Sequence, residues 1–122
     1  MYIKHEVGRK GEEIVTKYLE QKNYSILDKN FFCKQGEIDI IAKDRNSKEI
    51  VFIEVKTRKQ CFYGNPAEAV TKQKQKHILS VSKYYLYIKH LGNCLVRFDV
   101  IEVYLRQNTF KINHIKQAFY YE

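Results

Sequence analysis

Apolar residues recur at helical spacing in two parts of this chain. The first part, residues 8–22, has a stripe at i, i+1, i+4 and i+5, formed by Ile14, Val15, Tyr18 and Leu19. The second begins around residue 68 or 71 and runs to Leu91, followed by Gly92, a typical residue just beyond a helix end. Its apolar side carries Ile78, Val81, Tyr85 and Ile88. We therefore predict two helices, each with one buried face.

Strand patterns fill most of the remaining chain. Tyr24–Phe32 and Leu95–Leu105 are rich in β-branched and aromatic residues, and Phe110–Phe119 is expected to form a last strand. Gly36–Ile41 and Phe52–Arg58 alternate apolar and charged residues. Each should therefore have one apolar face, made of Ile38, Ile40 and Ala42 on one strand and of Val51, Ile53 and Val55 on the other.

The resulting order is α-β-β-β-α-β with one more strand at the end, and no internal repeat or linker divides the chain. An alternation of this kind predicts a single α/β domain over residues 1–122, with a mixed central sheet flanked by helices. The segment over residues 60–66 is expected to be a loop, because it contains Gly64 and the only proline of the chain.

The two alternating strands are joined by a short polar segment that predicts a hairpin. A turn centred on Asn46-Ser47 places Asp39 opposite Glu54 and Glu37 opposite Lys56. Directly opposed side chains lie about 4.5–5.5 Å apart, where like charges are destabilising. A divalent cation held by carboxylate oxygens would explain an acidic pair at this distance. A slip of the register by one residue would separate the two acids.

The net charge is +8, from 22 Lys and Arg against 14 Asp and Glu. A charge of this sign suggests a polyanionic partner such as nucleic acid. Between Val55 and Phe98 the only acid is Glu68, so the excess charge follows the two charged strands directly. The candidate nucleic-acid contacts are Arg58, Lys72, Lys74, Lys76 and Lys83. A solvated helix face is the alternative explanation for the lysines of the second helix.

The sequence gives no sign of a membrane or secreted protein. No segment approaches the roughly 18–20 apolar residues of a membrane span, and the N-terminus lacks the apolar region of a signal peptide. Three widely spaced cysteines without a CxxC motif fit reduced thiols and support neither a zinc site nor a disulfide framework. We expect a cytoplasmic protein with no membrane partner.

An Asp on one strand and Glu-x-Lys on the next, after a helix that carries a Glu, is the arrangement of PD-(D/E)xK nucleases. Over residues 8–104, the stretches of interest are Gly8–Glu12, Asn30, Gly36–Ile41, Phe52–Arg58, Gly64–Val70, Lys74 and Arg97–Val100. In these stretches the chain resembles the YraN-like family of small bacterial proteins with a restriction-endonuclease-like fold. That family is related to archaeal Holliday-junction resolvases. The resemblance implies an αβββαβ core.

The resemblance also implies a metal-dependent endonuclease that hydrolyses DNA phosphodiester bonds, with branched or structured DNA as the candidate substrate. Asp39 and Glu54 would hold Mg²⁺ or Mn²⁺ together with the Val55 carbonyl. Lys56 would orient or deprotonate the attacking water. Glu12 would complete the site from the first helix. Glu37 has two open roles, as an ion pair to Lys56 or as a further metal contact.

Other interpretations remain open from the residues alone. The charged strand positions fit a solvated face with surface ion pairs, and Glu12 fits an acid favoured by the helix N-terminus. The whole chain fits a nucleic-acid-binding module with the nuclease fold and little catalytic activity, or a protein-interaction domain. As a nuclease we expect DNA rather than RNA as partner, and a homodimer, since symmetric cleavage of a duplex needs two sites. Arg97 and Asp99 interrupt an apolar strand, and we expect a structural role for them.

Overall fold

Two helices and five strands are found in residues 6–59 and 70–121, the part of the chain that the computed structural model describes. Their order and bounds are α1 (Glu6–Gln21), β1 (Tyr24–Cys33), β2 (Gly36–Asp44), β3 (Glu49–Lys59), α2 (Lys72–Ile88), β4 (Val96–Arg106) and β5 (Thr109–Phe119). The predicted order of elements is confirmed, including the last strand. The predicted loop over residues 60–66 and the earlier start of the second helix at residue 68 lie outside the described residues.

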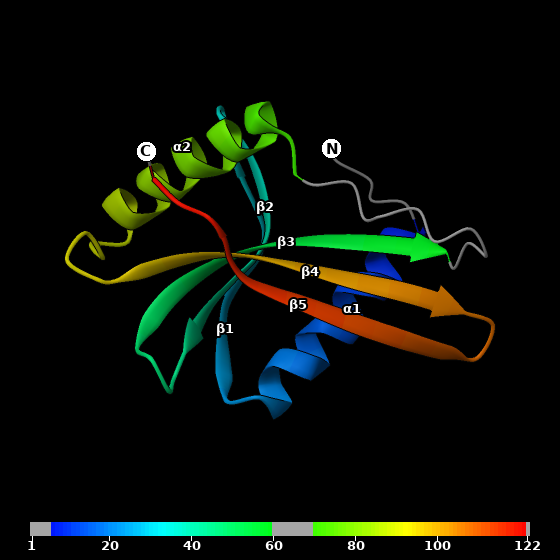
Figure 1. The fold of residues 1–122 in the computed structure, drawn as a ribbon. Helices are drawn as coiled ribbons and strands as arrows, with labels where there is room; N and C mark the ends of the chain where they lie inside the picture. The colour runs from blue at the N-terminus through cyan, green and yellow to red at the C-terminus, as the bar shows by residue number, and fades with distance from the viewer. Residues whose placement is uncertain (1–5, 60–69, 122) are drawn as a thin grey trace.

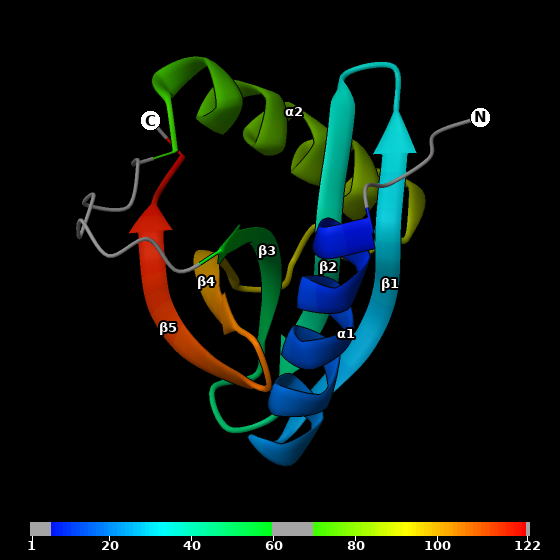
Figure 2. The same cartoon turned by 90° about the vertical axis from the view of Figure 1, so that its right-hand side faces the viewer.

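The five strands form one mixed sheet in the order β1-β2-β3-β4-β5. β3 and β4 run parallel, and the other neighbours run antiparallel. A parallel pair needs a crossover connection, which here includes α2. The two helices cover opposite faces of the sheet (Figures 1 and 2). The predicted α/β class, with a mixed sheet between helices and an αβββαβ core, is therefore confirmed.

Each face of the sheet has its own hydrophobic core. Val15 and Leu19 of α1 pack with Val51 and Ile53 of β3 on one face. On the other face, α2 packs over β2, β3 and β4 through a cluster that includes Ile78, Val81, Tyr85, Phe52 and Phe98. Two separate cores explain why β3 is buried on both sides over its first half.

The end of α2 differs from the prediction. The helix ends at Ile88, three residues before the expected end at Leu91, and Gly92 lies beyond its cap. His90 takes the left-handed backbone conformation instead, with φ of 58°. The N–H of His90 bonds the Tyr87 carbonyl at 3.2 Å, and the N–H of Leu91 bonds the Leu86 carbonyl at 2.8 Å. These two bonds form a Schellman motif, which satisfies the last carbonyls of the helix without a glycine.

The predicted hairpin register is confirmed from Ile40 to Asp44, but the ladder contains neither the predicted pair of Asp39 with Glu54 nor that of Glu37 with Lys56. Five pairs, from Ile40 with Ile53 to Asp44 with Glu49, join β2 to β3. Within the described residues the ladder goes no further toward the start of β2, and Figure 1 shows β2 turning away from β3. The two strands therefore form a fork just beyond Ile40 and Ile53.

The fork makes one expectation about the apolar face of β2 wrong. Ile40 and Ala42 share one face as predicted, on the α1 side, but Ile38 packs on the α2 side together with Ile41. The alternation of faces is thus broken around Asp39. The physical reason is the bend of β2 at the fork, which a regular period of two does not include.

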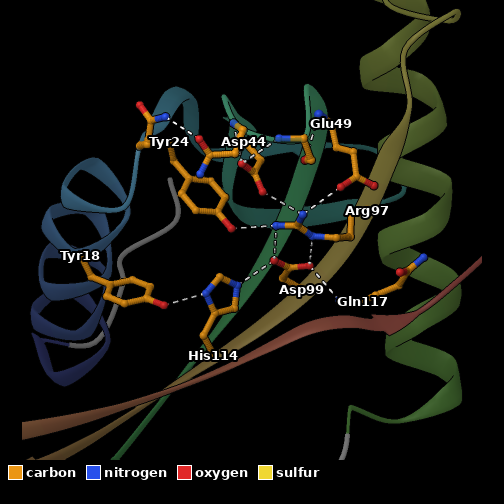
Figure 3. A network of polar contacts seen from close by, with 11 residues as sticks. Tyr18, Tyr24, Asp44, Glu49, Arg97, Asp99, His114 and Gln117 are labelled. Atoms are coloured by element: carbon orange, nitrogen blue, oxygen red, sulfur yellow. Dashed lines mark hydrogen bonds and ion pairs between the residues drawn. The ribbon is translucent and has the colours of Figure 1, made fainter.

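A buried network of polar groups crosses the α1 side of the sheet (Figure 3). At its centre, Arg97 donates to both carboxylate oxygens of Asp99, from Nε at 2.9 Å and from Nη2 at 3.0 Å. Its Nη1 donates to Asp44 and to Glu49, each at 2.9 Å. Its Nη2 also donates to the Tyr24 hydroxyl at 2.8 Å. The five N–H groups of the guanidinium therefore match five acceptor contacts.

The network continues from Asp99 to α1 and β5. His114 Nε2 lies 2.7 Å from Asp99 Oδ2, and the Gln117 N–H donates to Asp99 Oδ1 at 3.0 Å. The Tyr18 hydroxyl lies 2.9 Å from His114 Nδ1. The network thus joins all five strands and α1. The expected structural role of Arg97 and Asp99 agrees with this position, although the sequence did not indicate their partners.

Candidate active site

Asp39 lies at the fork, where the ladder between β2 and β3 stops. Its Oδ2 accepts a hydrogen bond of 2.8 Å from the Val55 backbone N–H. A side-chain carboxylate thus satisfies a β3 amide just beyond the last β2–β3 pair. The bond holds the Asp39 carboxylate against the edge of β3, beside Glu54.

Glu54 is the buried member of the acidic pair, with only 7 % of its surface exposed. Burial, the neighbouring charge of Asp39 and a hydrogen bond between the two side chains together raise the pKa of Glu54 to about 8. The positive charges of Lys74 and Lys56 act in the opposite direction and do not cancel this rise. The predicted meeting of Asp39 and Glu54 is therefore present in the structure.

Two lysines lie beside the Glu54 carboxylate. Lys56 Nζ, from the same strand, is 3.9 Å from Glu54 Oε2, and Lys74 Nζ is 3.4 Å from the same oxygen. Their side chains are 36 % and 42 % exposed, so both amines reach solvent. Lys74 lies in the first turn of α2, where its own N–H is capped by the Thr71 hydroxyl at 3.1 Å.

The position of Lys74 differs from its predicted setting. The sequence placed it among cations that contact a nucleic-acid backbone, whereas the structure brings its amine to a site carboxylate. Twenty residues separate Lys74 from Glu54. Only the packing of α2 over the sheet brings them together, so spacing along the chain offered no signal for this contact.

Glu12 and Glu37 are the two further acids considered for the site. Glu12 is buried on α1, next to Gly11, whose close approach to the Thr57 side chain leaves no room for a Cβ. Glu37 is half-buried near the start of β2. Within residues 6–59 and 70–121, no group of three or more Asp, Glu, His or Cys side chains is arranged to hold a metal. The roles of Glu12 and Glu37 at the site stay predictions.

The remaining candidate contacts to nucleic acid lie in different surroundings. Arg58 Nε is 3.7 Å from Oε2 of the buried Glu102, an acid that the sequence analysis did not single out. Glu102 Oε1 also accepts a 2.8 Å hydrogen bond from Asn113. Exposed positions on α2 hold three further lysines, namely Lys72, Lys76 and Lys83. Their contacts to phosphate stay predictions.

None of the helices in the described ranges is both long and apolar enough to cross a membrane.

Comparison with known proteins places this chain in a family. The profile of the family described as "Uncharacterised protein family UPF0102" matches residues 11–103. The chain belongs to this family. The match begins within α1, includes the fork and extends through most of β4, and it confirms the resemblance to YraN-like proteins.

Full-length relatives agree with this assignment. A UPF0102 protein of Caldicellulosiruptor saccharolyticus is 47 % identical over 118 residues, which cover 95 % of this chain and 98 % of the relative. A UPF0102 protein of Clostridium perfringens is 48 % identical over 116 residues, covering 93 % of each chain. Among solved structures, Pyrococcus furiosus SfsA in complex with Ca²⁺ is 15 % identical with a TM-score of 0.41, over 90 % of this chain and 62 % of SfsA.

Proposed function

We propose that this UPF0102 protein is a metal-dependent nuclease that hydrolyses phosphodiester bonds, with DNA rather than RNA as its substrate and branched or structured DNA as the first candidate. The observation that carries the proposal is the direct contact of the buried Glu54 carboxyl with Asp39, which helps to raise the pKa of Glu54 to about 8. Two adjacent carboxyl groups with this mutual repulsion suit a hard divalent cation, which prefers oxygen ligands.

Asp39 and Glu54 would hold Mg²⁺ or Mn²⁺, with the Val55 carbonyl as a third candidate ligand. A bound cation would supply positive charge that polarises the phosphate oxygens of the substrate. The Val55 N–H already orients the Asp39 carboxylate at 2.8 Å, so this ligand needs little rearrangement. The fork leaves the β3 edge beyond Ile53 without a β2 neighbour in the described chain, which gives the substrate a place to approach.

Lys56 and Lys74 would act on the substrate itself. Both amines lie within 4 Å of Glu54 Oε2 and reach solvent. In hydrolysis a water oxygen forms a bond to phosphorus, the bond from phosphorus to the leaving sugar oxygen breaks, and that oxygen takes up a proton. Lys56 would orient the water and stabilise the charge that grows on the phosphate. Lys74 would hold a neighbouring phosphate oxygen.

The test combines metal binding with cleavage. We expect isothermal titration with Mn²⁺ or Mg²⁺ to show binding by the wild type and none by Asp39→Asn. Glu13→Gln, an exposed acid on α1, is the matched control and should bind as the wild type does. Cleavage of branched and plasmid DNA should fall by about 100-fold or more in Asp39→Asn and Lys56→Ala. Absence of cleavage across plasmid, branched and single-stranded DNA with either metal would contradict the proposal.

A second candidate function is a nucleic-acid-binding module that keeps the fold without its chemistry. It is favoured by the presence of only two acids, rather than three or more candidate ligands, at the fork in the described residues. Salt-dependent DNA affinity that is unchanged by metal and by Asp39→Asn would support this module over the nuclease. The homodimer stays a prediction for either function.

A further inference from the structure

An open groove lies between α1 and the hairpin that joins β4 to β5. Its volume is about 770 Å³. Lys10 of α1, Lys59 of β3 and Arg106 of β4 line it, together with hairpin residues 107–109. A smaller adjoining pocket of about 240 Å³ extends the groove to Phe110 on β5. We call this surface the hairpin groove.

The charged side chains that line the hairpin groove are all positive. Among the residues that the structure describes, three cations and no acid line it. Lys10, Lys59 and Arg106 have no ion pair or side-chain hydrogen bond within residues 6–59 and 70–121. By contrast, the cations described above at the fork and in the Arg97 network each contact a carboxylate. Three unpaired cations facing one hollow favour an anionic ligand.

The hairpin groove also has apolar lining residues, namely Leu105, Ile14 and Phe110. Lys59 pairs with Leu105 across β3 and β4, and Leu105 pairs with Phe110 across β4 and β5. These three residues therefore form one row on the same face of the sheet. Phe110 is 54 % exposed although it is a large aromatic residue. An exposed aromatic ring beside cations is the combination that binds unpaired bases by stacking and phosphates by charge.

The hairpin groove lies within reach of the acidic pair. Glu54 and Lys59 are five residues apart on β3, about 16 Å of extended strand. They face opposite sides of the sheet, but in the described chain the β3 edge between them has no β2 partner. A nucleic-acid strand at the fork could therefore cross this edge and enter the groove.

We propose that the hairpin groove binds a single-stranded segment of nucleic acid, with its phosphates on Lys10, Lys59 and Arg106 and a base stacked on Phe110. This inference takes from the proposed function only that the ligand is nucleic acid, and it adds the surface that holds the strand beside the acidic site. The groove was not among the contacts expected from the sequence, because its three cations come from three separate elements.

The experiment measures binding of a labelled oligothymidylate of about 12 nucleotides by fluorescence anisotropy. EDTA is present throughout, so that neither metal binding nor cleavage contributes. The groove variant combines Lys10→Ala, Lys59→Ala and Arg106→Ala. The matched control combines Lys17→Ala, Lys43→Ala and Arg45→Ala, three exposed cations outside the groove. Both variants lose three positive charges, so a difference between them reports position rather than net charge.

We expect the groove variant to bind at least tenfold more weakly at about 0.05 M salt, and its slope of log K against log salt to be shallower by about 2. The control variant should keep most of the affinity and slope of the wild type. Phe110→Ala should weaken binding about fivefold with an unchanged slope, whereas Phe32→Ala, another exposed aromatic, should have no effect. Thermal unfolding should be unchanged in all of these variants, because the altered side chains are exposed.

Equal affinity of the groove and control variants would overturn the inference. Tighter binding of duplex than of single-stranded DNA, with no effect of Phe110→Ala, would overturn the assignment to a single strand. Cleavage assays test the proposed nuclease function separately. If the groove variant loses binding but the wild type cleaves no DNA, the groove inference holds and the nuclease proposal is refuted. If the wild type cleaves DNA but the groove variant binds as the control does, the nuclease proposal holds and the groove inference is refuted.

Discussion

Two clusters of acids lie on opposite faces of one sheet, and they differ in how fully their charges are compensated. In the Arg97 network, three carboxylates meet a guanidinium whose five N–H groups all have acceptors at 2.8–3.0 Å. At the fork, the Glu54 carboxyl meets another carboxyl and two amines at 3.4 and 3.9 Å. The first cluster is closed by hydrogen bonds, and the second is open to solvent through its lysines.

The pKa directions follow from this difference. Burial alone would raise the pKa of Asp99, but hydrogen bonds from His114, Arg97 and the Gln117 N–H hold the pKa of this carboxyl below its ordinary value. At the fork, burial and the Asp39 carboxylate raise the pKa of Glu54 to about 8. Buried acids neutralised within the chain are typical of a structural role, whereas a buried acid without full neutralisation is a candidate site for a ligand.

The largest expected effect is on the closed cluster. Arg97→Ala leaves three carboxylates without their shared cation and should lower the free energy of unfolding by about 3–5 kcal/mol. Urea denaturation at neutral pH measures this loss. Arg45→Ala, an exposed arginine of the β2–β3 turn, is the control and should change stability by less than about 0.5 kcal/mol. A small loss in Arg97→Ala would remove the distinction between the clusters.

The open cluster should show its character in the pH dependence of stability. The folded protein binds the Glu54 proton more tightly than the unfolded chain does, because the pKa rises from 4.5 to about 8 on folding. The stability from this group is therefore complete below pH 4.5 and is lost as the pH rises through 8.

Between pH 5 and 8, metal-free wild type should lose about 1–3 kcal/mol relative to Glu54→Gln, which carries no titrating group. Urea denaturation of both proteins across this range checks the expectation. Parallel curves for wild type and variant would show that Glu54 titrates as an ordinary carboxyl. Added Mn²⁺ should restore the stability of the wild type at pH 8 and release a proton on binding.

His114 tests how far the closed cluster depends on its outer members. His114→Ala removes the 2.7 Å contact to Asp99 and the contact to the Tyr18 hydroxyl, while Arg97 still neutralises the carboxylate. We expect a loss of about 1.5–2 kcal/mol in the free energy of unfolding. His77→Ala, on the exposed side of α2, serves as the comparison. A loss as large as that of Arg97→Ala would mean that the stability of the network depends on His114 as much as on Arg97.

Lys74 should give the smallest effect. Its amine is partly exposed and lies 3.4 Å from Glu54, so Lys74→Ala should cost at most about 1 kcal/mol at pH 8.5. At pH 5.5, where Glu54 is protonated, the cost should vanish. Thermal melts at the two pH values, with Lys76→Ala as the control on the same helix, distinguish this from a general effect of charge.

Local sequence patterns predicted the secondary-structure elements and the β2–β3 register well. The period of apolar residues located both helices and all five strands, and counting back from the hairpin turn predicted the register of β2 and β3. The counting works because each residue of a regular ladder has one partner, so a turn of known length fixes every pair. The same count predicted that the Asp39 and Glu54 side chains meet, although the ladder itself ends one pair earlier.

Features that depend on distant packing were missed or wrong. Ile38 changes face because β2 bends at the fork, and a regular alternation does not contain the bend. His90 closes α2 in place of Gly92, because a Schellman cap can tolerate a non-glycine residue when both of its hydrogen bonds form. Lys74 reaches Glu54 only through the docking of α2.

By itself, the sequence determined the order of elements, the hairpin register and the meeting of two acids beside a lysine on β3, because all of these depend on neighbours within a few residues. Tertiary structure alone decided that one acidic cluster is closed by Arg97 and the other left open. It also brought Lys10, Lys59 and Arg106 around one groove. Burial and charge compensation depend on which distant elements pack together, and the spacing of apolar residues along the chain does not contain that information.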